Sequence, residues 1–293
     1  MSVSTAFEPR LDFVQCLDRQ QLHRMAYWEW GDPGNRNVLV CVHGLTRQGR
    51  DFDTLARALC DRYRVVCPDV VGRGRSDWLA DAVEYENGTY VADMVTLLAR
   101  LDAESVDWVG TSMGGLIGMR LASLPGSPIR TLVINDVGPT LDPSGLARIG
   151  SYVGAPVRFA TEEDGLGYLA SVAKSFGPHN REEWRALNRP MLKKAENGDG
   201  FVLHYDPLIA LPFKAMTPAA VEAAEATMWQ RYDAIRARTL VIRGAESDLL
   251  SADTAEQMAR RGPRAAVREV PGVGHAPTLI AEEQIALVRE FLS

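Results

Sequence analysis

Short apolar runs alternate with helical patterns along most of this 293-residue chain, and this alternation limits the possible folds more than any other feature. The run Val38–Val42 (VLVCV) is apolar at every position, which is typical of a strand buried on both faces of a sheet. Similar runs recur at 64–70, 106–110, 130–136, 238–244 and 266–270, and helical patterns follow at 53–59, 90–101, 116–124, 252–261 and 281–292. The alternation predicts an α/β fold, a mostly parallel central sheet with helices on both faces. A hairpin around residues 22–30, closed by the turn sequence GDPG, is expected to precede it.

The alternation stops between Asp136 and Thr239. A crossover between parallel strands needs roughly 12 residues, so the interval contains an inserted structure. Helical periodicity returns within it at 168–176, 182–196 and 218–235. We therefore expect a core formed by residues 1–138 and 233–293 and a helical cap formed by residues 139–232. The cap is expected to cover the edge where the strands have their carboxyl ends, because open α/β sheets bind ligands there.

Composition excludes several classes of protein. The net charge of -6 argues against a nucleic-acid partner, which normally meets a basic face. The four cysteines show no C-x-x-C spacing, so a disulfide framework or zinc site is not expected, and reduced thiols fit a cytoplasmic protein. The N-terminal sequence lacks the pattern of a signal peptide, and no run of 18 apolar residues predicts a membrane span. We expect a cytoplasmic protein whose partner is a small molecule, with no membrane association.

Polar residues suited to catalysis follow the predicted strands. Ser112 lies between the run 106–110 and the helix at 116–124, and His43-Gly44 follows VLVCV. Asp248 follows the run 238–244 in GAESDLL, and His275 follows the run 266–270 in GVGHAP. Because the carboxyl ends of parallel strands lie along one edge, these residues are expected to meet there. Serine becomes a nucleophile when a neutral imidazole accepts its proton, and a carboxylate stabilises the resulting imidazolium.

The chain resembles the α/β-hydrolase family over nearly its whole length. The resemblance rests on G-x-S-x-G at Gly110–Gly114, the His-Gly loop, the segment PDVVGRGRSD (68–77) and the order serine, aspartate, histidine. It implies Ser112 as nucleophile, His275 as base and Asp248 as acid. It also implies an oxyanion hole built from the backbone N–H groups of Leu45 and Met113, with His43 and Gly44 organising the loop. The family mechanism needs no metal and no cofactor.

Each of these residues also has a simpler interpretation. Ser112 could cap the following helix, and some members of the family take the acid from the preceding strand, where Asp136 stands. The segment PDVVGRGRSD is interpreted as a structural turn. The roles of Arg47, His179, His204 and the cap aromatics, as pocket residues or as ordinary packing and surface residues, stay open at this point.

The resemblance favours a serine hydrolase that cleaves a small soluble carboxylic ester through an acyl-enzyme. HGLTRQGRDFDTLA, NDVGP and GHAPTL are most similar to bacterial intracellular esterases, among them hydrolases of 3-hydroxybutyrate oligomers. One alternative is a C–C bond hydrolase of aromatic degradation, although its elbow usually has Asn where this chain has Thr111. Another is a small-molecule receptor without enzymatic activity on the same fold.

Overall fold

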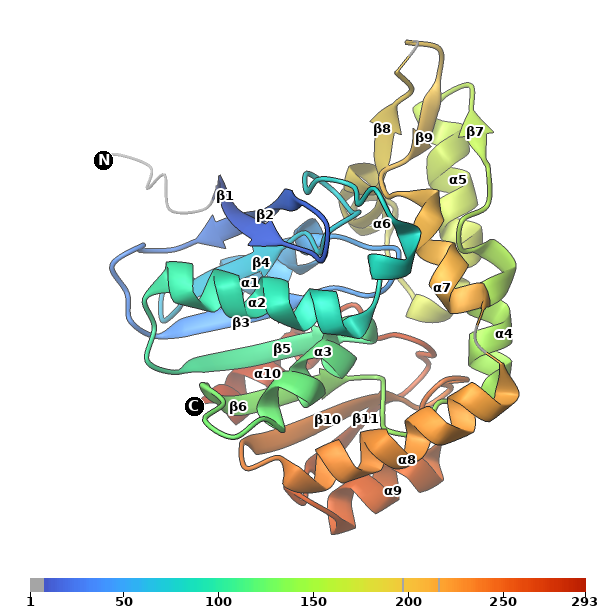
Figure 1. Cartoon of the computed structure of the whole chain (residues 1–293). Coiled ribbons are helices and arrows are strands. Elements are labelled where there is room, and N and C mark those ends of the chain that lie inside the picture. The colour runs from blue at the N-terminus through green and yellow to red at the C-terminus, as the bar shows by residue number, and fades with distance from the viewer. Residues whose placement is uncertain (1–7, 197, 216) are drawn as a thin grey trace.

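An eight-stranded sheet forms the centre of the protein (Figure 1). The computed structural model describes residues 8–196, 198–215 and 217–293. The strands lie in the order β1-β2-β4-β3-β5-β6-β10-β11. The pairs β1–β2 and β2–β4 are antiparallel and the remaining neighbours are parallel, so the mostly parallel sheet is confirmed. The strands are β1 (Arg10–Leu17), β2 (Leu22–Trp30), β3 (Val38–Val42), β4 (Arg64–Pro68), β5 (Val106–Thr111), β6 (Ile129–Asn135), β10 (Arg238–Gly244) and β11 (Ala266–Val270).

Helices cover both faces of this sheet (Figure 1). One apolar core joins the sheet to α1 and α10, through residues such as Leu55 and Val288. The other joins it to α2, α3, α8 and α9, through residues such as Met94 and Ile117. Both faces of the central strands are thus buried, which explains why β3 carries no polar residue. These helices are α1 (Asp53–Leu59), α2 (Asn87–Leu101), α3 (Met113–Ala122), α8 (Pro218–Ala234), α9 (Ala252–Arg260) and α10 (Glu282–Leu292).

The N-terminal hairpin differs in detail from the expectation. β2 occupies residues 22–30 as expected, but its partner is β1 and the hairpin turn lies at 18–21. The GDPG sequence instead begins the connection from β2 to β3. The strand β1 was missed because it is largely exposed on the sheet edge and carries polar residues at several positions.

The inserted segment between β6 and β10 contains helices and a small sheet that extends beyond the edge of the main sheet (Figure 1). Its three antiparallel strands are too short to give a pattern in the sequence. A separate apolar cluster around Phe159, Leu169, Met191 and Leu192 holds this part together. Its elements are α4 (Pro143–Tyr152), β7 (Arg158–Phe159), α5 (Glu162–Val172), α6 (Arg181–Asn188), β8 (Leu192–Lys194), β9 (Phe201–Leu203) and α7 (Ala210–Lys214).

The helix α8 lies at the C-terminal side of the insertion but packs with the core. Its residue Tyr232 is fully buried and donates a hydrogen bond to the carbonyl of Met258 on α9 at 2.7 Å. The expected boundary of the insertion at residue 232 therefore falls inside a helix that packs with the core. Residues 1–7 of the expected core lie outside the described residues of the structure. Among the described helices, none has the length and apolar composition to cross a bilayer.

Candidate active site

Ser112 occupies the sharp turn between β5 and α3. Its φ of 52° and ψ of -115° are strained for a residue with a side chain. The turn is closely packed, because a Cβ added at Gly114 would lie 2.0 Å from the carbonyl oxygen of Val42. Ser112 makes no side-chain hydrogen bond to the start of α3, so it does not serve as a helix cap. Its hydroxyl lies beside the imidazole of His275 instead.

His275 joins Ser112 to an aspartate. Its Nε2 atom lies 3.0 Å from Oγ of Ser112, and its Nδ1 atom lies 2.8 Å from Oδ2 of Asp136. The imidazole and the carboxylate are buried. An ionised carboxylate only accepts hydrogen bonds, so the neutral ring carries its proton on Nδ1 and directs the lone pair of Nε2 toward the serine hydroxyl. This is the arrangement in which histidine removes a proton from serine.

Asp136 is held firmly where β6 ends. Its backbone has a φ of 57°, and its N–H donates to the carbonyl of Ile242 on the neighbouring strand at 2.7 Å. The carboxylate accepts hydrogen bonds from the N–H of Gly244 at 2.7 Å and from Oγ of Ser247 at 2.6 Å. Three donors, counting His275, thus fix the orientation of this fully buried carboxylate.

The prediction that Asp248 holds the His275 ring is wrong. The Asp248 carboxylate pairs with the guanidinium of Arg148 at 2.5 and 2.8 Å, and about a third of its side chain is exposed. The hydrogen bonds from Arg148 hold the pKa of Asp248 below its usual value. The loop after β10 instead turns Ser247 toward Asp136. The carboxylate that contacts His275 comes instead from the end of the preceding strand, where Asp136 was the alternative acid.

The His43–Leu45 loop lies beside Ser112. His43 accepts a hydrogen bond from the N–H of Val70 at Nε2 (2.9 Å), so its Nδ1 carries the proton and donates to the carbonyl of Gly44 at 2.7 Å. Complete burial lowers the pKa of His43 to about 3, and the ring is neutral. The carbonyl of His43 also accepts from the N–H of Gly114, which ties the loop to the serine turn. His43 is thus positioned to organise this loop, with Gly44 and Leu45 in the pocket wall beside Ser112.

Arg73 also supports this region, although its sequence segment gave no hint of a role beyond a turn. The side chain is fully buried, and its guanidinium donates to the carbonyls of Leu45 at 2.9 Å and Val71 at 2.7 Å. It also lies 3.6 Å from Sδ of Met113. Arg73 therefore contacts both residues whose N–H groups are expected to form the oxyanion hole. Met113 is the first residue of α3, where backbone N–H groups have no acceptor within the helix.

A pocket opens over Ser112 and His275. The inserted segment contributes Ile149, Tyr152 and Phe176 to its walls, whereas Arg47 and Asp51 follow β3. Arg47 is not a solvated loop residue: it is buried, paired with Asp51 at 2.7 Å and hydrogen-bonded to Oδ1 of Asn188 at 2.9 Å. The pocket is therefore mainly apolar, and the charges of Arg47 and Asp51 on one side of it neutralise each other.

The remaining candidates have mainly structural contacts. His204 bonds to the carbonyl of Pro190, and His179 lies 2.8 Å from Oγ1 of Thr278, a residue of the pocket wall. Among the cap aromatics, Tyr152 lines the active-site pocket, whereas Trp229 packs into the core and donates to Oγ1 of Thr140 at 2.9 Å.

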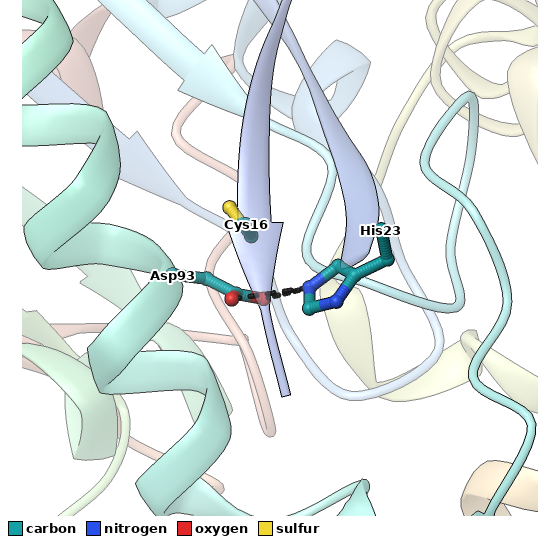
Figure 2. A group of neighbouring side chains, drawn as sticks. All are labelled: Cys16, His23 and Asp93. Atoms are coloured by element: carbon teal, nitrogen blue, oxygen red, sulfur yellow. Dashed lines mark hydrogen bonds and ion pairs between the residues drawn. The ribbon is translucent and has the colours of Figure 1, made fainter. Parts of the chain in front are cut away.

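Cys16, His23 and Asp93 form a buried group, and none of the three lines the active-site pocket (Figure 2). Nε2 of His23 lies 3.0 Å from Oδ2 of Asp93, which links the β1–β2 hairpin to α2. Burial opposes the charged ring, but the hydrogen bond and charge of Asp93, with the charge of Asp18, outweigh it and raise the pKa of His23. Burial and Asp93 raise the pKa of the Cys16 thiol. The bond between His23 and Asp93 thus makes this buried group a structural link between the hairpin and the helix that covers it.

The chain matches the model of the alpha/beta hydrolase family over residues 39–289. The chain belongs to this family. It is 58% identical over 287 residues to a 3-hydroxybutyrate-oligomer hydrolase of Cupriavidus necator, an alignment that covers 97% of this chain and 98% of that protein. The predicted fold, family and hydrolase class are confirmed.

Solved structures agree with this family membership. A putative hydrolase from Rickettsia typhi superposes with a TM-score of 0.87 at 30% identity and covers 97% of this chain and 98% of its own. An alpha/beta hydrolase from Novosphingobium aromaticivorans superposes with a TM-score of 0.85 at 34% identity, with the same coverage. Both matches cover 97% of this chain, too much to leave out the inserted segment, so the fold is shared along nearly the whole chain.

Proposed function

We propose that this protein hydrolyses short soluble carboxylic esters, with 3-hydroxybutyrate oligomers as its substrate class, through an acyl-enzyme on Ser112. The observation that carries the proposal is the hydrogen-bonded series Ser112, His275 and Asp136 at the base of a pocket. The substrate class is supported by the 58% identity to a hydrolase of such oligomers. We place the reaction in the cytoplasm, where the buried thiols of Cys16, Cys41 and Cys67 would stay reduced.

The reaction begins when Oγ of Ser112 attacks the ester carbonyl carbon while Nε2 of His275 accepts the hydroxyl proton. The carbonyl π bond opens and leaves a negative oxygen on the tetrahedral intermediate. When this intermediate collapses, the C–O bond to the alcohol breaks and the imidazolium returns the proton to the leaving oxygen. Water then repeats the sequence on the acyl-enzyme, with His275 accepting its proton, and releases the carboxylic acid and free Ser112.

Asp136 would stabilise the imidazolium during both halves of the reaction. Its fixed carboxylate keeps the Nδ1 proton in place and supplies a negative charge 2.8 Å from the ring. The N–H groups of Leu45 and Met113 would donate to the negative oxygen, and their loop and helix are held in position before the substrate arrives. Such donors stabilise the transition state more than the uncharged ester, which accelerates the reaction.

The inserted segment would select substrates by size. We propose that it acts as a cap, with the start of α8 as its C-terminal limit, because Ile149, Tyr152 and Phe176 form part of the pocket wall near Ser112. A substrate must enter a pocket that this segment partly covers, which favours soluble molecules over an insoluble polymer surface.

A hydrolysis panel on the purified protein tests the substrate class. The panel contains 3-hydroxybutyrate dimer and trimer, p-nitrophenyl butyrate and a vinylogous diketone, and the oligomers and the butyrate ester are expected to be cleaved. Ser112→Ala is the matched control, and it should lose turnover and labelling by a fluorophosphonate probe. Cleavage of the diketone alone would identify a C–C bond hydrolase, and tight binding without turnover would identify a receptor. Either result would refute the proposal.

A further inference from the structure

A second pocket adjoins the active-site pocket on the side of the cap. It shares Thr46, Arg47, Tyr152 and Phe176 with the first pocket. These shared side chains lie where the two pockets adjoin, and Ser112 and His275 line the first pocket but not the second. The second pocket therefore lies beside the space in which a substrate would bind.

The other walls of the second pocket are mainly apolar. Leu169 and Val172 come from α5, Leu203 comes from β9, and Met191 lies just before β8. The hydroxyl of Tyr205, another wall residue, accepts a hydrogen bond from the N–H of Gly154. Methyl and methylene groups fit such walls. Burying an uncharged ester group among them costs much less desolvation energy than burying a charged carboxylate.

Arg47 is the charged residue among the described residues that line the second pocket, and it is already neutralised. Its guanidinium contacts both carboxylate oxygens of Asp51, at 2.8 and 2.7 Å, and donates to the carbonyl of Leu187 at 2.9 Å. A free carboxylate placed in this pocket would have no unpaired cation to meet. Burying such a charge is expensive, so the pocket disfavours a ligand that ends in a carboxylate.

We propose that the second pocket is a subsite for the acyl side of a linear aliphatic ester, where it takes the part of the chain beyond the unit next to the cleaved bond. This inference rests on the proposed function and adds a direction to it. In a 3-hydroxybutyrate oligomer the acyl side of each ester ends in a hydroxyl group and the alcohol side ends in a carboxylate. The apolar subsite accepts the hydroxyl-terminated side, and the carboxylate-terminated side stays outside it.

A tryptophan placed in the subsite tests this inference. Val172 is half-buried at the end of α5 and lines the second pocket but not the first, so Val172→Trp fills the subsite and leaves the core intact. The adjacent Ser171 is exposed, and Ser171→Trp is the matched control. The substrates are p-nitrophenyl acetate, p-nitrophenyl octanoate, octyl acetate and the tetramer of 3-hydroxybutyrate, each measured as kcat/KM.

Val172→Trp is expected to lower kcat/KM for the octanoate and the tetramer by about tenfold or more, a typical effect of a lost apolar subsite. The acetate and octyl acetate should change by less than about twofold, and Ser171→Trp should leave all four values near those of the wild type. Equal losses on acetate and octanoate, or no loss on octanoate, would refute the subsite. A loss confined to octyl acetate would refute its direction.

The wild-type protein separates this inference from the proposed function. Cleavage of octanoate without cleavage of the tetramer would remove 3-hydroxybutyrate oligomers as the substrate class, while the octanoate effect of Val172→Trp would still support an acyl subsite. A wild-type protein that cleaves none of these esters would refute the proposed function, and the subsite with it.

Discussion

Replacing the buried carboxylate of Asp136 by an amide should abolish most of the activity through the protonation state of His275. In the wild type, Oδ1 accepts from the N–H of Gly244, which can only donate, and Oδ2 accepts from Nδ1 of His275. In Asp136→Asn the amide oxygen must stay opposite Gly244, so the NH₂ group faces His275. The ring must then accept at Nδ1 and carry its proton on Nε2, where it points at Ser112 and cannot act as a base.

The expected loss in kcat is about 10⁴-fold, the usual effect of this change in a serine triad. It corresponds to about 5.4 kcal/mol of transition-state stabilisation at 1.36 kcal/mol for each tenfold change. Asp248→Asn is the matched control, since it removes an ion pair with Arg148 whose side chains are each about a third exposed, and it should change kcat by less than about threefold.

Steady-state hydrolysis of p-nitrophenyl butyrate measures both variants, with thermal unfolding to show that each is folded. The reasoning would be refuted if Asp248→Asn lost activity and Asp136→Asn kept it. It would also be refuted if a folded Asp136→Asn variant retained more than about a tenth of the wild-type kcat.

The other predictions concern the support of the site and the packing of the chain. Arg73→Met should lower kcat by about 10- to 100-fold and change KM by less than about threefold, because the carbonyl of Leu45 loses a donor that positions the oxyanion loop. The affinity for a trifluoromethyl ketone, which mimics the tetrahedral intermediate, should fall in parallel with kcat/KM. A rise in KM as large as the fall in kcat would contradict this role. His43, with its pKa lowered to about 3, should remain neutral at pH 5 in nitrogen NMR spectra, whereas the unfolded chain takes up a proton below about pH 6.5. The unfolded state then binds more protons than the folded state at pH 5. The free energy of unfolding, measured with urea, should therefore be about 2 kcal/mol lower at pH 5 than at pH 8 because of His43. A His43 ring that protonates near pH 6 in the folded protein would overturn this prediction. Gly114→Ala should prevent stable folding because the new Cβ would collide with the carbonyl oxygen of Val42. Gly167→Ala, at an exposed position of α5 with open space around it, should raise the free energy of unfolding by about 0.5–1 kcal/mol. Similar effects at both sites would show that the close contact between Gly114 and Val42 is unimportant.

The polar residues after the strands were predictable because their positions depend on local patterns. The strand and helix periods on either side of Ser112 define the turn, and His275 follows a strand end that must lie on the same edge. Arg73 could not be predicted in the same way, since its partners Leu45 and Met113 come from two other segments of the chain. The short strands of the inserted sheet and the exposed strand β1 lack the periodicity on which prediction depends.

The sequence by itself determined the α/β architecture and the serine turn, because both follow from hydrophobic periodicity and glycine placement within short segments. The pairing of Ser112 with His275 followed from the resemblance to the α/β-hydrolase family, because the two residues lie far apart in the chain. The sequence left two acids, Asp136 and Asp248, at the ends of strands that turned out to be neighbours, β6 and β10. Only the tertiary structure decided between them. The backbone at Asp136 turns its carboxylate beneath His275 and buries it among three donors, while the loop after β10 directs Asp248 outward to Arg148. The choice depends on side-chain direction across two packed strands, and no local pattern carries that information.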